Sequence, residues 1–253
     1  MHTHPIVAKS DWLEARRALL AKEKALTRAR DQLAQERRAL PWVRIDKPYV
    51  FDGPRGKVTL SDLFDGRSQL IIKHFMKGCS FEVDHLEGIL VHLNNHDVTY
   101  AAVARAPIEE IEALRRRMGW TFPFVSSYGS DFNYDFDVSF RCAEVAAGRA
   151  LYNFGRAPDW AADIEDLSGL SVFLRGDDGA IYLTYASFAR GGEEALAVYA
   201  ILDMMPKGRQ ENGPYHSLGD WVRPHDQYGK GGTVEGNGRY HAADCGCAAH
   251  ERG

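Results

Sequence analysis

The chain has 253 residues and a formal net charge of −4, with 45% hydrophobic and 26% charged residues. This composition is typical of a soluble globular protein and excludes a wholly disordered chain. The slight acidic balance argues against nucleic acid as a partner, and no stretch approaches the roughly 20 apolar residues of a membrane helix. Because four cysteines are too few for a secreted disulfide framework, we expect a cytoplasmic protein.

The first part of the chain predicts one long helix over residues 10–39, with Ser10 as its N-cap. Large apolar residues recur at every seventh position, in a stripe of Trp12, Leu19, Leu26, Leu33 and Leu40. The companion heptad positions are only half apolar, so the stripe is narrow. Such a helix either lies on its own domain or packs on a second subunit. We predict a homodimer in which this helix and the tail after residue 206 touch the other subunit.

The middle of the chain alternates predicted strands and helices. The nearly continuous apolar run over residues 69–76 suits a strand buried on both faces at the centre of a sheet. We further expect hairpins at 49–60 and 171–185, strands at 97–104 and 122–127, helices at 81–94, 108–118 and 193–204, a helical turn at 61–64 and an irregular aromatic insertion at 131–157.

This order of elements is that of a thioredoxin-like α/β fold, with a four- or five-stranded mixed sheet flanked by helices. Strands that alternate with helices indicate a parallel centre with right-handed crossovers. We predict three parts: an N-terminal helical extension (1–46), a thioredoxin-like domain (47–206) and an extended C-terminal tail (207–253).

A reactive thiol is predicted at Cys79, where the central strand meets the helix that follows it. The unpaired N–H groups and partial positive charge of a helix start favour a thiolate. Lys77 adds a positive charge, and Asp84 and His85 lie within two turns and could tune the thiol. The alternative is a cysteine of ordinary reactivity at the start of a helix.

Several long motifs carry a family resemblance, at residues 74–76, 78–81, 84–85, 88–94, 103–107, 116–120, 126–136 and 221–226. In these motifs the sequence resembles a bacterial family of thioredoxin-like proteins of unknown function, often labelled predicted dithiol-disulfide oxidoreductases. The resemblance covers almost the whole chain and implies the thioredoxin-like fold. The activity that the resemblance implies is exchange with a protein or small-molecule disulfide, and this implication rests on the fold alone.

The chain departs from the family just before Cys79. Family members carry a Gly-rich, Trp-containing loop that ends in C-x-x-C, and its second cysteine corresponds to Cys79. Here Met76 stands three positions before Cys79. Either the loop is lost and single-cysteine chemistry remains, or a mobile loop with a second cysteine belongs between Met76 and Lys77. We favour the second alternative and expect a chain break there, wider than the roughly 3.8 Å between Cα atoms of neighbouring residues.

The other candidate residues are weaker. Cys142 is expected to be a packed thiol in the aromatic insertion. Two histidines and two cysteines of the tail are weak candidates for a metal site: His241, Cys245, Cys247 and His250. Their C-x-C spacing is not that of a zinc knuckle, and we predict neither a metal nor a cofactor. Three aromatic residues are candidates for the wall of a pocket, with plain packing as the alternative: Tyr128, Phe132 and Tyr134.

Three classes of function remain open at this point. A thiol-disulfide oxidoreductase is favoured by the position of Cys79. A thiol peroxidase is the second class, but Met76 occupies the Thr position of the usual Thr-x-x-Cys arrangement. The third is a binding or redox-sensor protein that kept the fold without the chemistry.

Overall fold

A computed structural model of the protein describes residues 4–76, 80–164, 166–213, 221–229, 233–234 and 240–241. The chain forms two compact units, Met1–Trp42 and Val43–Gly253. No described helix is both long enough and apolar enough to cross a membrane.

The first unit is built around the helix α1 (Lys9–Arg38), close to the predicted range. The N-cap is Ala8 rather than Ser10, because the Ser10 hydroxyl donates a hydrogen bond to the neighbouring Asp11 carboxylate (3.0 Å) and caps no backbone N–H. Arg37 and Arg38 in the last turn suit the negative end of the helix dipole. No side chain of α1 is buried, and the residues of the heptad stripe are all exposed.

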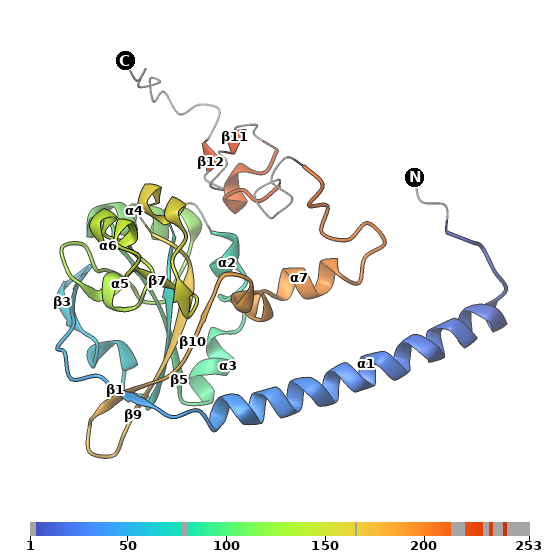
Figure 1. Ribbon diagram of the computed structural model, residues 1–253, viewed down its shortest axis with the longest axis horizontal. Helices are drawn as coiled ribbons and strands as arrows, with labels where there is room; N and C mark the ends of the chain where they lie inside the picture. The colour runs from blue at the N-terminus through green and yellow to red at the C-terminus, as the bar shows by residue number, and fades with distance from the viewer. Residues whose placement is uncertain are drawn as a thin grey trace. The chain divides into compact units, whose positions relative to one another are not determined.

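Within the second unit, eight described strands form one mixed sheet in the order β1-β10-β9-β4-β5-β6-β2-β3 (Figure 1). Their bounds are β1 Val43–Arg44, β2 Val50–Gly53, β3 Gly56–Thr59, β4 Gln69–His74, β5 Val98–Ala104, β6 Phe124–Ser126, β9 Gly169–Arg175 and β10 Ile181–Phe188. β4 is central, parallel to β5 and antiparallel to β9, as the apolar run predicts.

The predicted number of four or five strands is too low. The hairpin β2–β3 joins the sheet through the pairing of Asp52 with Ser126 of β6, and β1 pairs with β10 at the opposite edge. Local patterns indicate hairpins, but they do not say which distant strand a hairpin pairs with. The parallel centre with antiparallel β9 and β10 confirms the thioredoxin-like α/β fold.

Helices lie on both faces of the sheet. The described helices of this unit are η1 (Asp62–Phe64), α2 (Phe81–Asp84), α3 (Leu90–Asn95), α4 (Ile108–Met118), α5 (Phe132–Asp135), α6 (Cys142–Ala146), η2 (Asp159–Asp163), η3 (Ala189–Ala195), α7 (Ala197–Leu202) and η5 (His225–Gln227). Two small hairpins are formed by β7 (Leu151–Tyr152) with β8 (Gly155–Arg156) and by β11 (Thr233–Val234) with β12 (Tyr240–His241). Leu70 and Ile72 of β4 face a core shared with η1 and α5, whereas Phe75 packs with Val83 of α2 and Ile111 of α4 on the other face.

α4 has the predicted bounds and ends at Gly119 in the left-handed region (φ 70°). The predicted helix over 81–94 is instead broken into α2 and α3, because Val83, Asp84, His85 and Gly88 are weak helix formers. The predicted helix over 193–204 is also shorter, since its first part forms η3.

Candidate functional site

The predicted site lies at the connection between β4 and α2. The carboxyl ends of β4 and β5 are in register, with His74 opposite Val103, and the Phe75 N–H donates to the Val103 carbonyl (2.8 Å). In α/β sheets, ligands and reactive groups gather at this end of the strands. Residues 77–79 lie outside the described residues, so the surroundings of Lys77 and Cys79 stay predictions. The full sequence carries Lys77 directly after Met76, so the expectation of a loop with a second cysteine between these two residues is wrong.

A buried ion pair fixes the sheet side of α2. The Lys73 ammonium of β4 lies 2.9 Å from a Glu82 carboxylate oxygen, and the two side chains are only 6% and 15% exposed. The Ser168 hydroxyl accepts a hydrogen bond from Lys73 and donates to Glu82 (2.9 Å). Buried charges are tolerated when they are paired and hydrogen-bonded. The cluster therefore ties α2 to the central strand and to the segment before β9.

Asp84, one of the predicted thiol-tuning residues, is engaged at the other end of α2. Its carboxylate accepts a hydrogen bond from the indole N–H of Trp120 (2.9 Å) and lies 2.7 Å from Nδ1 of His225. Asp226, next to His225, pairs with Arg117 of α4 (3.3 Å). Asp84 therefore connects α2 to a segment far along the chain. Sequence reasoning singled out His225 only as part of a family motif.

His85, the second predicted tuning residue, has both ring nitrogens buried with no hydrogen-bond partner among the described residues. The buried hydroxyl of Ser80, which follows Cys79 directly, also has no described partner. Buried polar atoms of this kind normally bind a water molecule or another polar group. Ser80 and His85 are thus two residues close to Cys79 in the sequence whose buried polar atoms have no partner among the described residues.

His74 at the end of β4 is a functional-looking residue with a structural role. Its ring is 1% exposed and stacks on Phe132 (centroids 5.5 Å apart), and Nε2 lies 2.8 Å from the Ser171 hydroxyl oxygen. Burial, assisted by the charge of Lys73, lowers the pKa of His74 to about 3. The imidazole is therefore neutral at physiological pH and belongs to the core.

The three aromatic candidates for a pocket wall lie in different surroundings. Phe132 is fully buried in the core, whereas Tyr128 is 60% exposed. The ring of Tyr134 is covered by the guanidinium groups of Arg141 (4.0 Å) and Arg105 (5.4 Å). Phe132 thus packs in the core, and Tyr134 packs under two cations.

The remaining cysteine candidates are resolved in part. Cys142 is exposed at the start of α6, so the expectation of a packed thiol is wrong: its helix presents Val145 to the interior instead. Cys245, Cys247 and His250 lie outside the described residues, and for His241 only the backbone in β12 is described. Within the described part of the chain, no three His, Cys, Asp or Glu side chains are grouped as metal ligands.

The strand order and the parallel centre of the sheet define the second unit as a thioredoxin-like domain. The chain itself belongs to a bacterial protein family: the family model described as "Bacterial protein of unknown function (DUF899)" matches residues 1–228. No curated protein matches the sequence.

Several solved structures of peroxiredoxins are similar to this chain. Peroxiredoxin Q of Xanthomonas campestris is 16% identical with a TM-score of 0.41, and the similarity covers 60% of this chain and 88% of that one. Peroxidoxin BcpB of Mycobacterium tuberculosis is 12% identical with a TM-score of 0.40, covering 60% and 90%. The mitochondrial 2-Cys peroxiredoxin of Plasmodium falciparum is 11% identical with a TM-score of 0.38, covering 64% and 91%. At these identities the similarity carries no conclusion about activity.

Proposed function

We propose that the protein catalyses thiol-disulfide exchange with Cys79 as its nucleophile. The observation that carries this proposal is the place of Cys79 in the sequence, in the short connection between the carboxyl end of the central strand β4 and α2. In α/β proteins reactive groups gather where the central strands end, and Cys79 follows the central strand in the sequence. The unpartnered polar atoms of Ser80 and His85 support a site that binds polar or sulfur-containing groups.

The reaction proceeds through a mixed disulfide. The Cys79 thiolate attacks one sulfur of a substrate disulfide, an S–S bond forms between protein and substrate, and the second substrate sulfur leaves as a thiolate. The sequence has methionine rather than cysteine three residues before Cys79. An external thiol such as glutathione therefore attacks the mixed disulfide, releases Cys79 as a thiolate and forms a new disulfide with the substrate sulfur.

The test compares Cys79→Ser with Cys142→Ser, which removes an exposed thiol on α6. We expect Cys79→Ser to abolish the reduction of two substrates, a mixed disulfide of glutathione and the disulfides of insulin. Cys142→Ser should keep the wild-type rate with both substrates. Full activity of Cys79→Ser would overturn the proposal. Parallel measurement of peroxide consumption distinguishes a thiol peroxidase, and absence of both activities from the wild-type protein indicates a binding or sensor protein.

We also propose that the protein is a homodimer located in the cytoplasm. α1 has 30 residues and leaves Leu19 and Leu26 of its heptad stripe 51% and 53% exposed, whereas no other described helix exceeds the 11 residues of α4. Seven-residue spacing is typical of helices that pair with helices. A second α1 is therefore a partner of matching length.

A charge placed on the stripe tests the dimer. We expect the double variant Leu19→Glu with Leu26→Glu to sediment as a monomer at micromolar concentration. The control carries the same two added charges on the opposite side of α1, as Ala21→Glu with Gln35→Glu, and should sediment like the wild type. A monomeric wild type, or equal behaviour of both double variants, would count against pairing through this stripe.

A further inference from the structure

Residues 221–229, here called the strap, contact the domain through their side chains. Between described residues, the only backbone–backbone hydrogen bond of the strap runs from the Gln227 N–H to the Pro224 carbonyl (2.8 Å), inside the strap itself. A segment that forms part of a sheet or helix is joined to it by backbone hydrogen bonds as well. The strap is therefore attached to the domain as a separate piece, by a small set of side chains.

The first two residues of the strap cover an apolar surface that α2 and α7 share. Phe81 of α2 lies against Tyr199 of α7 (ring centroids 5.4 Å apart), and Leu196 just before α7 belongs to the same cluster. We call these three side chains the α2–α7 surface. The Trp221 ring packs on Phe81 (5.7 Å), and Val222 is 6% exposed in this cluster. An aromatic and an aliphatic side chain thus anchor the strap.

Two polar contacts follow the apolar anchor along the strap. Nδ1 of His225, four positions after Trp221, lies 2.7 Å from the Asp84 carboxylate. The carboxylate of the next residue, Asp226, lies 3.3 Å from Arg117 of α4. These four polar side chains are between 24% and 50% exposed, and exposed pairs contribute little to stability. The polar contacts therefore set the direction of the strap, and the apolar pair holds it.

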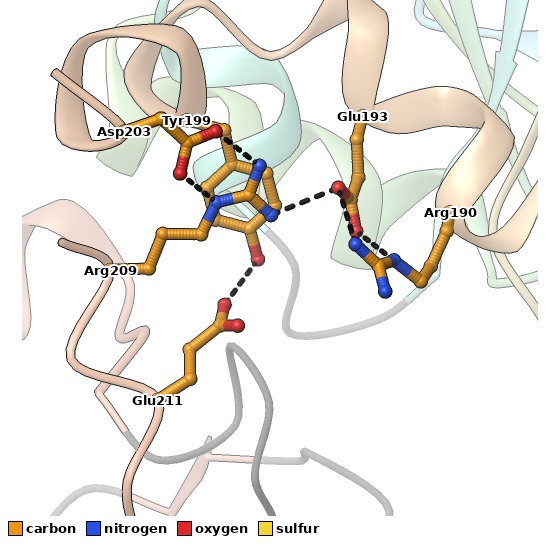
Figure 2. A network of polar contacts seen from close by, with 6 residues as sticks. All are labelled: Arg190, Glu193, Tyr199, Asp203, Arg209 and Glu211. Atoms are coloured by element: carbon orange, nitrogen blue, oxygen red, sulfur yellow. Dashed lines mark hydrogen bonds and ion pairs between the residues drawn. The ribbon is translucent and has the colours of Figure 1, made fainter.

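The α7 side of this surface is built without the strap (Figure 2). The Arg209 guanidinium lies 3.9 Å from the centre of the Tyr199 ring and binds both carboxylate oxygens of Asp203 (2.7 Å each). A further guanidinium nitrogen contacts Glu193 (2.9 Å), and the Tyr199 hydroxyl donates to Glu211 (2.9 Å). Since none of these residues belongs to the strap, Tyr199 keeps its place when the strap leaves.

The strap covers the surface at a cost. The indole N–H of Trp221 and one carboxylate oxygen of Asp226 are buried with no hydrogen-bond partner among the described residues. A polar atom that loses its water and gains no partner lowers the stability of the contact that buries it. A segment with the same apolar anchor but without these two unpaired atoms therefore binds the α2–α7 surface more tightly than the strap does.

We infer that the α2–α7 surface is a docking site for a segment of another protein, and that the strap occupies it as an internal substitute which the partner displaces. The contacts define the partner's chemistry. It carries an aromatic and an aliphatic residue, followed four and five positions after the aromatic by a hydrogen-bond donor for Asp84 and a carboxylate for Arg117.

A second copy of this chain also contains such a segment, but it does not supply it. The strap of each copy is already bound within its own chain, where the tether gives it a high effective concentration. Exchange between two copies breaks and remakes the same contacts and gains nothing. The displacing segment therefore comes from a different protein.

The experiment uses the full chain and a fluorescein-labelled peptide with the sequence of residues 221–229 as the probe. Trp221→Ala empties the aromatic position of the strap. We expect fluorescence anisotropy to show at least about tenfold tighter binding of the peptide to Trp221→Ala than to the wild type, whose surface is covered. The same peptide with alanine in place of its tryptophan should not bind. Trp160→Ala, which removes an exposed tryptophan of η2, is the matched control and should behave like the wild type.

Two further variants test the polar contacts. His225→Ala with Asp226→Asn keeps the apolar anchor of the strap and loosens its exposed end, so it should bind the peptide more tightly than the wild type and less tightly than Trp221→Ala. This variant also provides the test if Trp221→Ala does not fold. Adding Arg117→Gln to Trp221→Ala should weaken peptide binding by up to about fivefold, because it removes one exposed ion pair.

Equal binding of the peptide to the wild type and to both strap variants overturns the inference, as does the absence of binding to a folded Trp221→Ala. A complex between the wild type and Trp221→Ala in sedimentation would make a second copy the occupant, and would overturn the assignment to another protein. Because these measurements require neither enzymatic turnover nor a reactive thiol, their result is independent of the proposed function.

Discussion

Nδ1 of His225 lies 2.7 Å from a carboxylate oxygen of Asp84, although 141 residues separate the two in the sequence. The same oxygen accepts the indole N–H of Trp120, so one carboxylate joins α2, the segment before β6 and the segment 221–229. The side chains of His225 and Asp84 are 42% and 24% exposed, which limits what their pairing contributes to stability. The contact acts chiefly by fixing where the C-terminal segment lies.

The first prediction concerns this contact. We expect His225→Ala to speed amide hydrogen exchange in a peptide covering residues 221–229, while the free energy of unfolding falls by only about 0.5 kcal/mol. His92→Ala, at an exposed histidine of α3, should change neither quantity. Unchanged exchange in His225→Ala would show that Val222 and Trp221 hold the segment without the contact between His225 and Asp84.

The second prediction concerns the buried pair below α2. We expect Lys73→Met to lower the free energy of unfolding by about 3–5 kcal/mol, because it leaves the Glu82 charge buried without its partner. The double variant Lys73→Met with Glu82→Leu should recover most of this loss. Lys57→Met breaks the exposed pair with Asp52 and should cost less than about 1 kcal/mol. Urea unfolding monitored by circular dichroism measures all three, and equal costs at Lys73 and Lys57 would contradict the prediction.

The third prediction concerns pH. The folded protein holds the pKa of His74 at about 3, below its ordinary value of 6.5, so below pH 6.5 the unfolded chain binds a proton that the folded chain does not. Stability from this residue is therefore complete above pH 6.5 and is lost as pH falls toward 3.

Urea unfolding at pH 7.5 and 5.0 measures this effect. The contribution of His74 between these two values is about 2 kcal/mol. We expect His74→Gln, which keeps a polar group for Ser171, to show a smaller loss by about that amount. An identical pH dependence in wild type and variant would exclude His74 as its source.

The fourth prediction uses two glycines whose added Cβ atoms would meet nothing within 4 Å. Gly119 closes α4 with φ +70°, a conformation that costs other residues about 1 kcal/mol or more, so Gly119→Ala should lower the melting temperature. Gly88 is outside the left-handed region, and Gly88→Ala should be neutral or stabilising by up to about 1 kcal/mol. Calorimetry of both variants gives the sign of the change in melting temperature for each, and a destabilising Gly88→Ala would contradict this account.

Much of the fold was predictable from local pattern. The apolar run of β4 indicates a central strand, and the pattern of α4 together with Gly119 gives that helix its observed bounds. These features depend on burial period and backbone conformation, which neighbouring residues in the chain determine. The structure differs from the pattern chiefly at 81–94, because apolar spacing predicts one helix there although Val83, Asp84, His85 and Gly88 are weak helix formers.

The sequence assigns the candidate site a place in the chain, after the central strand, but it does not predict the contacts of the residues that follow. The sequence alone determined that a cysteine follows the central strand, and that Asp84 and His85 come soon after it. Only the tertiary structure decided that Asp84 is bound by Trp120 and His225, that Glu82 pairs with a buried lysine, and that Cys142 is exposed.

The reason is that these contacts join residues whose separation in the chain carries no information about their separation in space. Periodicity reports which side of a strand or helix is buried, but not which distant element covers it. Tyr199 reaches Phe81 because β10 runs antiparallel to β9, and β9 antiparallel to β4, so that β10 and β4 end at the same edge of the sheet. The sequence thus determined the elements of this protein, and the packing of the sheet decided which of their side chains meet.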